Sequence, residues 1–276
     1  MPIFHAIVLG IVQGLAEFLP ISSSGHLLLV PWLFGWDDLA DAGVKKAFDV
    51  SLHIGTLVAV VAYFRRDLVI YVREGLRLVV SRQRPTSPEG RLAWLLVVSA
   101  LPAAAVGALF EETIDEVLGT PALIAVSLIV FGLVLAWADR RTGTRTIEEY
   151  RGKDALLVGA AQALALNPGT SRSGITITAA RTFGFSRDAA ARISFLMSIP
   201  VTTGAVVFKM TKLLMDGIPA DLRVPMVVGI VTSGLAGWVA VWGTIRLVRT
   251  RSFMPFVIYR CVLGVVVLVV IAAGWR

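Results

Sequence analysis

The stretch QGLAEFLPISSSGHLLLV, residues 13–30, decides how this chain has to fold. It lies in an apolar N-terminal run, yet it holds a glutamate, three serines and a histidine around Pro20. Proline breaks helices, and irregular backbone survives at membrane depth only where protein buries it or a watery cavity adjoins it. The stretch therefore predicts a re-entrant helix–loop–helix hairpin between two apolar pieces too short to span: Ile3–Leu19 and His26–Phe34.

A second stretch, QALALNPGTSRSGITI at residues 162–177, repeats this pattern 149 residues further on. Gln13 aligns with Gln162 and Ser22 with Ser171, and a glycine follows each serine three positions later. We expect a second re-entrant hairpin here, whose apolar pieces are Ala155–Leu166 and Ile175–Phe183. The two loops should meet near the membrane midplane and line a polar pocket, because lipid cannot satisfy their backbone groups.

The composition indicates a polytopic membrane protein. Of the 276 residues, 56% are hydrophobic and 16% charged, and the mean hydropathy is +0.78. Runs near the roughly 20 apolar residues that span a bilayer occur at Phe48–Phe64, Leu92–Phe110, Pro121–Ala138, Ile193–Phe208, Val224–Val248 and Met254–Trp275. We predict an all-α single membrane domain, residues 1–276, with about six full spans plus the two hairpins. No cleavable signal peptide is expected, since the N-terminus lacks a basic region.

Basic residues are confined to short loops, so the net charge of +7 indicates topology rather than nucleic-acid binding. Lys and Arg concentrate on the inner side of a membrane, which places the basic segments 65–91, 139–153 and 246–251 inside. The acidic segment 111–120 should lie outside, together with 36–46 and 216–223. The spans after the two hairpins then run in opposite directions. This predicts an inverted-topology repeat with halves at approximately 1–138 and 154–275.

The first hairpin carries acid–base and anion-binding candidates. Gln13 and Glu17 are four residues apart and share a helix face, and a carboxylate at bilayer depth is usually functional. Glu17 could instead only order the loop. Serines before a helix can cap it and bind anions with its free amides, although serine is also common where membrane helices pack closely. His26 follows in the same segment and is a general acid–base candidate. His5 and His53 have no such company, and we expect both to be structural.

Arg172 in the second hairpin needs an anionic partner. Its planar fork suits phosphate oxygens, while an ion pair with Glu17 would be structural, and both roles could hold together. Further donors surround it: Gly169, Ser171, Ser173 and Thr176. The combined set fits a phosphate or diphosphate headgroup whose apolar tail stays in the lipid. The lone cysteine, Cys261, can form neither an internal disulfide nor a cysteine metal site.

These residues also carry a family resemblance. QGLAEFLPISSSGH resembles an [E/Q]-x-x-x-E motif with trailing serines and histidine, and PGTSRSGIT resembles P-G-x-S-R-S-x-x-T. Both are signatures of bacterial undecaprenyl-diphosphate phosphatase, the bacitracin resistance protein family, to which FMPFVIYR at 253–260 is also similar. The resemblance implies removal of the terminal phosphate from undecaprenyl diphosphate, which recycles the lipid carrier for peptidoglycan synthesis. It also implies a bacterial inner-membrane enzyme that is open to the outer face and depends on a divalent cation, Mg²⁺ or Ca²⁺.

Matching by motif assigns roles to individual residues. The resemblance implies that Glu17, Ser23, His26 and Arg172 are catalytic, and that Ser22, Ser24, Gly169, Ser171, Ser173 and Thr176 bind phosphate. Gln13 and Glu17 would hold or support the metal, although glutamine at the first position removes one possible acidic ligand. Arg260 is a weaker candidate, which could equally be an arginine snorkelling to the inner face. Two mechanisms stay open: attack by Ser23 with His26 handling the proton, or attack by a metal- or carboxylate-activated water.

Other classes of protein fit less well. A flippase or transporter of a phosphorylated polyprenyl lipid would use the same broken helices, and a homodimer is compatible with either function. A second membrane phosphatase family needs a histidine five residues after Ser-Arg, where this chain has Thr178 and Ile193. An intramembrane serine protease would give Arg172 no role.

Overall fold

The computed structural model describes residues 1–38, 41–81, 87–117 and 119–275. Within those residues the chain forms helices and no β-strand, and six helices are long and apolar enough to cross a membrane. They are α3 (Ala42–Tyr63), α5 (Pro88–Val117), α6 (Pro121–Asp139), α9 (Arg187–Asp216), α10 (Ala220–Val248) and α11 (Met254–Ala272). The predicted all-α polytopic membrane protein is confirmed, with each span where a hydrophobic run placed it.

The two predicted hairpins are broken helix pairs. The first comprises α1 (Ile3–Phe18) and α2 (Ser23–Phe34), and the second α7 (Gly152–Ala163), the 3₁₀ turn η2 (Leu164–Leu166) and α8 (Arg172–Thr182). Pro20 excludes Leu19 from helical geometry, so α1 stops there with Leu19 extended at ψ 138°. Their entry into a membrane from opposite sides stays a prediction.

The two breaks share one local geometry. Ser22 and Ser171, aligned in the sequence repeat, have φ of 78° and 74°, and no other described non-glycine residue has a positive φ. Each serine also caps the following helix: Ser22 Oγ accepts from the Gly25 amide at 3.3 Å, and Ser171 Oγ from the Gly174 amide at 3.1 Å. The repeated sequence pattern thus corresponds to a repeated backbone turn, and the division of the chain into two related halves stays a prediction.

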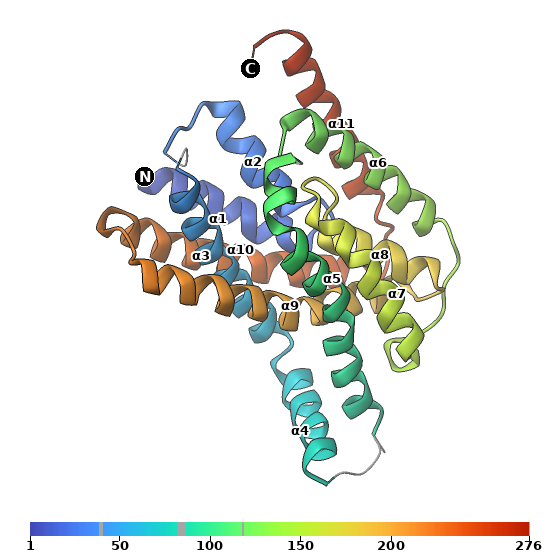
Figure 1. Ribbon diagram of the computed structural model, residues 1–276. Helices are drawn as coiled ribbons and strands as arrows, with labels where there is room; N and C mark the ends of the chain where they lie inside the picture. The colour runs from blue at the N-terminus through green and yellow to red at the C-terminus, as the bar shows by residue number, and fades with distance from the viewer. Residues whose placement is uncertain (39–40, 82–86, 118, 276) are drawn as a thin grey trace.

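The N-terminal and C-terminal parts of the chain interlock (Figure 1). Helices α1 and α3 pack on α10, and α3 also packs on α9. On the other side of the bundle α5 packs on α7, while α6 packs on α11 and α8. Because α7 begins the second hairpin as α1 begins the first, the contact between α7 and α5 is the counterpart of the contact between α1 and α10. This interlocking carries the loop of each hairpin to the centre of the molecule.

Glycines let α1 and α3 approach α10 closely. A Cβ placed on Gly14 of α1 would lie 2.5 Å from the Ser233 carbonyl oxygen, and one on Gly55 of α3 would lie 2.2 Å from that of Ile230. Small residues serve this purpose in membrane helices, where van der Waals contact rather than the hydrophobic effect drives packing. Ser233 Oγ adds a hydrogen bond to the Leu52 carbonyl oxygen at 2.9 Å. The end of α1, which carries Glu17, is thereby held in place.

The ends of four helices converge on one carboxylate. Asp139 is buried, and its oxygens accept from Arg187 Nε at 2.6 Å and from the Phe253 amide at 3.0 Å. Arg181 Nε lies 3.6 Å from the same carboxylate. Because these partners come from α9, α8 and the start of α11, Asp139 joins all of them to the end of α6. The loop that follows contains the 3₁₀ turn η1 (Ile147–Glu149).

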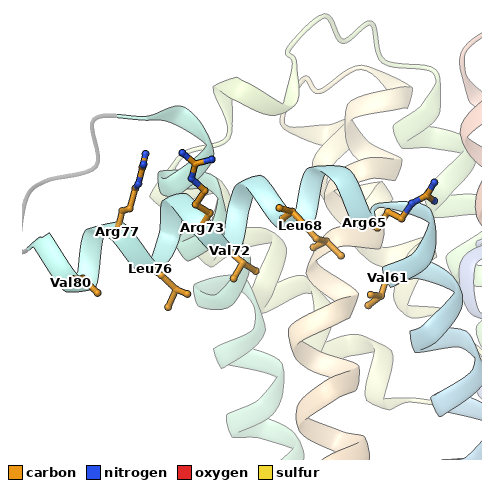
Figure 2. Close-up of a pocket in the computed structure, with 9 residues that line it drawn as sticks. Val61, Arg65, Leu68, Val72, Arg73, Leu76, Arg77 and Val80 are labelled. Carbon is orange, nitrogen blue, oxygen red and sulfur yellow. The ribbon is translucent and has the colours of Figure 1, made fainter.

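Helix α4 (Arg65–Ser81) is amphipathic, and with the start of α5 it projects from the bundle (Figure 1). Figure 2 shows Leu76 and Val80 pointing to one side of α4 and Arg73 and Arg77 to the other. An exposed apolar stripe beside arginines fits the boundary between membrane and water.

Two arginines of the basic segment 65–91 lie outside the described residues: Arg82 and Arg84. Residues 111–117 of the acidic segment form the end of α5, and their side chains are outside the described part.

Candidate functional site

The two hairpin loops touch each other, as the sequence predicted. The Gly169 amide donates to Ser22 Oγ at 3.0 Å, and Ser173 Oγ donates to the Leu19 carbonyl oxygen at 3.0 Å. The N-termini of α2 and α8 are consequently neighbours. The first amides of a helix have no intrahelical partner and sit at the positive end of its dipole. Two such ends side by side favour an anionic ligand.

Glu17 is the centre of the site. Its Oε1 accepts from Arg172 Nη2 at 2.6 Å, and its Oε2 accepts from Ser23 Oγ at 2.7 Å and from Gln13 Nε2 at 3.0 Å. Glu17 is only 7% exposed and Gln13 is fully buried. The structure therefore brings four of the predicted site residues together, across two loops separated by 155 positions in sequence. The ion pair with Glu17 exists, and it holds the guanidinium beside the Ser23 hydroxyl.

Most hydroxyls predicted to bind phosphate are already used within the loops. Ser22 and Ser171 cap helices, and the Ser173 hydroxyl bonds the opposite loop. Thr176 Oγ1 donates to the Arg172 carbonyl oxygen and to Ser194 Oγ, both at 2.8 Å. These buried groups shape the loops, and phosphate binding by them stays a prediction.

Ser24 and Gly169 have different positions in the site. Ser24 is exposed, and its hydroxyl lies 3.5 Å from Ser22 Oγ. Gly169 is buried with φ +94°, and a Cβ there would lie 2.7 Å from the Ile124 carbonyl oxygen. Only glycine fits this turn, which accounts for the Pro-Gly pair in the motif.

His26 is engaged at both ring nitrogens. Its Nδ1 lies 2.6 Å from the Ser22 carbonyl oxygen, and its Nε2 lies 2.7 Å from the Tyr259 hydroxyl. An Nδ1–H donating to a carbonyl leaves Nε2 as an acceptor, which the phenol satisfies. The two rings are stacked with centroids 5.6 Å apart. His26 thus joins the first loop to α11. Among the described residues, no hydrogen bond joins His26 to Ser23, with which it was predicted to exchange a proton.

Arg260 joins the two loops from α11. Its side chain has no exposed area, and it donates to the carbonyl oxygens of Pro20 at 3.1 Å, Gly169 at 2.9 Å and Thr170 at 3.0 Å. Nε donates to Leu128 of α6 at 3.0 Å. The alternative of an arginine snorkelling to the inner face is wrong. The reason is that α11 turns Arg260 inward, where two irregular loops leave carbonyls without helical partners.

His53 of α3, which we expected to be structural, lies beside Glu17 of the candidate site. Its Nε2 lies 3.9 Å from Glu17 Oε2, and its Nδ1 lies 2.7 Å from the Asp49 carbonyl oxygen. Sequence reasoning missed it because no motif surrounds it. The signal that could have found it is an ionisable side chain inside a predicted span. Tyr259 hydrogen-bonds His26, and Ser194 hydrogen-bonds Thr176. Neither residue is charged, so the sequence did not indicate a place for them near the site.

The chain's own side chains do not form a ready cation site. Among the described residues no group of three His, Cys, Asp or Glu could hold a metal ion. Both Glu17 oxygens accept hydrogen bonds, and a guanidinium lies 2.6 Å away. Gln13 Oε1 is buried without a partner among the described residues, but it is one neutral oxygen. Mg²⁺ usually takes one or two carboxylates together with waters and substrate phosphates, so these protein donors alone do not complete a cation's coordination, and a metal at this site stays a prediction.

The fold and the site together define a class: a polytopic helical membrane protein with a candidate anion site where two broken hairpins meet. Within that class the chain belongs to a particular family. The family described as bacitracin resistance protein BacA matches residues 6–266 of this chain.

Curated relatives of similar length agree with this family. A protein of Pelobacter propionicus named undecaprenyl-diphosphatase is 48% identical over 276 residues, covering 99% of each chain. Proteins of the same name are 44% identical in Pelotomaculum thermopropionicum, covering 99% of this chain and 98% of that protein, and 47% identical in Geobacter sulfurreducens, covering 97% and 98%.

Proposed function

We propose that this chain hydrolyses undecaprenyl diphosphate to undecaprenyl phosphate and inorganic phosphate. The observation that carries the proposal is the junction of Arg172, Glu17 and Ser23 between the two loops. It supplies a cation, a proton acceptor and a hydroxyl beside two helix N-termini, which together suit a lipid-borne diphosphate. The name of the relatives, undecaprenyl-diphosphatase, supports the same reaction. The product is the lipid carrier that peptidoglycan synthesis reuses, and its supply accounts for bacitracin resistance.

The contacts favour Ser23 as the nucleophile. Ser23 Oγ donates to Glu17 at 2.7 Å, so its proton has an acceptor at hand when the oxygen attacks the terminal phosphorus. Arg172 stabilises the charge on the transferring phosphoryl group. The competing mechanism is direct attack by a water that Glu17 activates. An early quench with substrate labelled at the terminal phosphate separates them, because only the first leaves phosphoserine at Ser23.

We place the enzyme in the bacterial inner membrane with its site open to the outer face. The basic residues of α4 and of the loop after α6 support this orientation, because such residues concentrate on the inner side. We further propose that Mg²⁺ or Ca²⁺ arrives as a partner of the diphosphate oxygens, since the protein donors alone do not complete a cation's coordination.

A phosphate-release assay on purified protein in detergent tests the proposed function. We expect wild-type protein to release inorganic phosphate, and Arg172→Ala to lose at least about 10²-fold in rate, the scale of one transition-state donor. Arg246→Ala, which removes an exposed arginine of α10, is the matched control and should keep the rate. Detergent allows no transport, so binding of the lipid without phosphate release would instead identify a flippase. A folded Arg172→Ala protein with the wild-type rate would contradict the assignment.

A further inference from the structure

The three histidines of the chain have different partners. His5 bonds Asp38 and stacks on Trp36 with ring centroids 3.8 Å apart. His26 is held at both nitrogens by the Ser22 carbonyl and the Tyr259 hydroxyl. His53 uses only Nδ1, which faces the Asp49 carbonyl oxygen at 2.7 Å, and its Nε2 makes no hydrogen bond among the described residues. The imidazole nitrogen that can exchange a proton at the site is therefore on α3.

His53 stands behind the acceptor of the Ser23 proton. Ser23 Oγ, Glu17 Oε2 and His53 Nε2 form a series with separations of 2.7 and 3.9 Å. The second separation is within ion-pair range, and a small side-chain movement would close it to a hydrogen bond. The His53 side chain is 35% exposed, against 6% for Glu17, so the imidazole is the more accessible of the two groups. Glu17, with Arg172 at 2.6 Å, is a poor place to keep a proton, because the guanidinium favours the charged carboxylate.

We propose that His53 is the proton relay of this site and takes from Glu17 the proton that Ser23 releases. The inference rests on the proposed phosphatase function and names a residue that the family motifs do not contain. His53 acts through Glu17, so it is a positioning and relay residue rather than one that touches the phosphorus.

The proposed steps balance as follows. In the first, the Ser23 O–H bond breaks, its proton passes through Glu17 to His53 Nε2, the Oγ–P bond forms, and undecaprenyl phosphate leaves as the P–O bond breaks. In the second, a water oxygen bonds to phosphorus and the Oγ–P bond breaks. The water proton returns to Ser23 Oγ, and the proton on His53 leaves with the inorganic phosphate.

Few other charges reach this imidazole. Glu17 faces it from α1 with Arg172 behind, and Asp49 lies one turn away on α3, paired with Lys45 at 2.7 Å. Helices α9 and α10, which pack on α3, carry no ionisable residue in their central stretches, 193–208 and 224–245. The pH dependence of phosphate release should therefore report on His53 and its neighbour Glu17.

The test is the pH dependence of kcat in wild type and His53→Gln, measured by phosphate release in detergent. A relay must be neutral to accept a proton, so wild-type kcat should fall towards acid pH. His53→Gln should lose about 10²-fold in kcat at neutral pH, lack this acid limb, and keep its KM. His5→Gln, which alters a histidine outside the site, is the control and should leave both rate and profile unchanged.

Chemical rescue separates a relay from a purely structural role. Added imidazole should restore part of the kcat of His53→Ala, even if that variant is less stable than wild type. It should leave the kcat of the wild-type protein unchanged. A His53→Gln protein that keeps its rate and its acid limb would overturn the inference, as would loss of activity without rescue in a protein of normal melting temperature. Absence of phosphate release from wild type would instead defeat the proposed function itself.

Discussion

At the scale of single residues, Arg260 is the side chain on which the site geometry depends most. Its guanidinium, wholly buried, bonds carbonyls of both loops and of α6. Each buried carbonyl left without a donor costs about 1–3 kcal/mol. We expect Arg260→Met to lower the melting temperature in detergent strongly and to abolish phosphate release. Arg260→Lys should keep little of the wild-type stability and activity, because one ammonium group cannot reach all the carbonyls that the planar guanidinium contacts.

The matched control for Arg260 is Arg246→Met on α10. Arg246 is exposed, with its guanidinium carbon 5.6 Å from the centroid of the Trp242 ring. Its replacement should leave both melting temperature and activity near the wild-type values. Arg260→Lys protein that melts and works like wild type would show that the loops hold together without this fork.

What the sequence could predict at this scale was the set of residues that local chemistry forces together. A glutamate and an arginine in two membrane hairpins each need a partner of opposite charge, and in the structure they form an ion pair with each other. His53 and Tyr259 could not be predicted, because their roles depend on which helices pack beside the loops. The ring nitrogens of His26 illustrate the same limit. The motif indicated an acid–base residue, and only the tertiary contact to α11 shows that both nitrogens are engaged.

At the scale of elements, the approach of α3 to α10 depends on Gly55. A Cβ there would lie 2.1 Å from Ser233 Oγ and 2.2 Å from the Ile230 carbonyl oxygen. Gly55→Ala should therefore destabilise the protein by about 1–3 kcal/mol, the usual cost of overpacking. It should also lower the activity, since α3 carries His53 and packs on α1. Thermal unfolding in detergent, paired with the phosphate assay, measures both effects.

Gly204→Ala on α9 is the control for this packing effect. Nothing lies within 4 Å of a Cβ at Gly204, so alanine should stabilise its helix by up to about 1 kcal/mol. The two substitutions are chemically identical and should shift the melting temperature in opposite directions. Equal shifts would mean that α3 and α10 can separate without cost.

The elements themselves were largely predictable, since a span is a local property of apolar length and a break is a local property of proline and glycine. Thr120 and Pro121 at the start of α6 show such a local signal, with the Thr120 hydroxyl accepting from the Leu123 amide at 3.4 Å. The pairing of α1 with α10 and of α5 with α7 is not local, and no spacing in the sequence indicated it. The predicted apolar run Leu92–Phe110 stopped short of the end of this helix, because α5 continues to Val117.

At the scale of the whole molecule, the fold assembles the candidate anion site from both halves of the chain, and we have proposed that the cation arrives with the substrate. Each half contributes one loop, and neither loop holds more than part of the donor set: the carboxylate comes from the first and the guanidinium from the second. Arg260 of α11 hydrogen-bonds the Leu128 carbonyl oxygen of α6 and thereby holds both helices beside the site. A ligand that bridges the two loops should consequently stabilise the entire bundle, whereas an ion that only one carboxylate can bind should not.

This difference gives a prediction about thermal stability. A ligand at 100 times its Kd adds about 2.7 kcal/mol to the free energy of unfolding. We expect Mg²⁺ alone to leave the melting temperature of the detergent-solubilised protein unchanged, and a methylene-bridged prenyl diphosphonate to raise it. Mg²⁺ and the diphosphonate together should raise it further than the diphosphonate alone. The same additions to Arg172→Ala should have little effect, because the loop that meets the anion has lost its cation. Saturable stabilisation by Mg²⁺ alone, absent in Glu17→Gln, would show instead that the protein holds the ion itself and that Glu17 exchanges Arg172 for it.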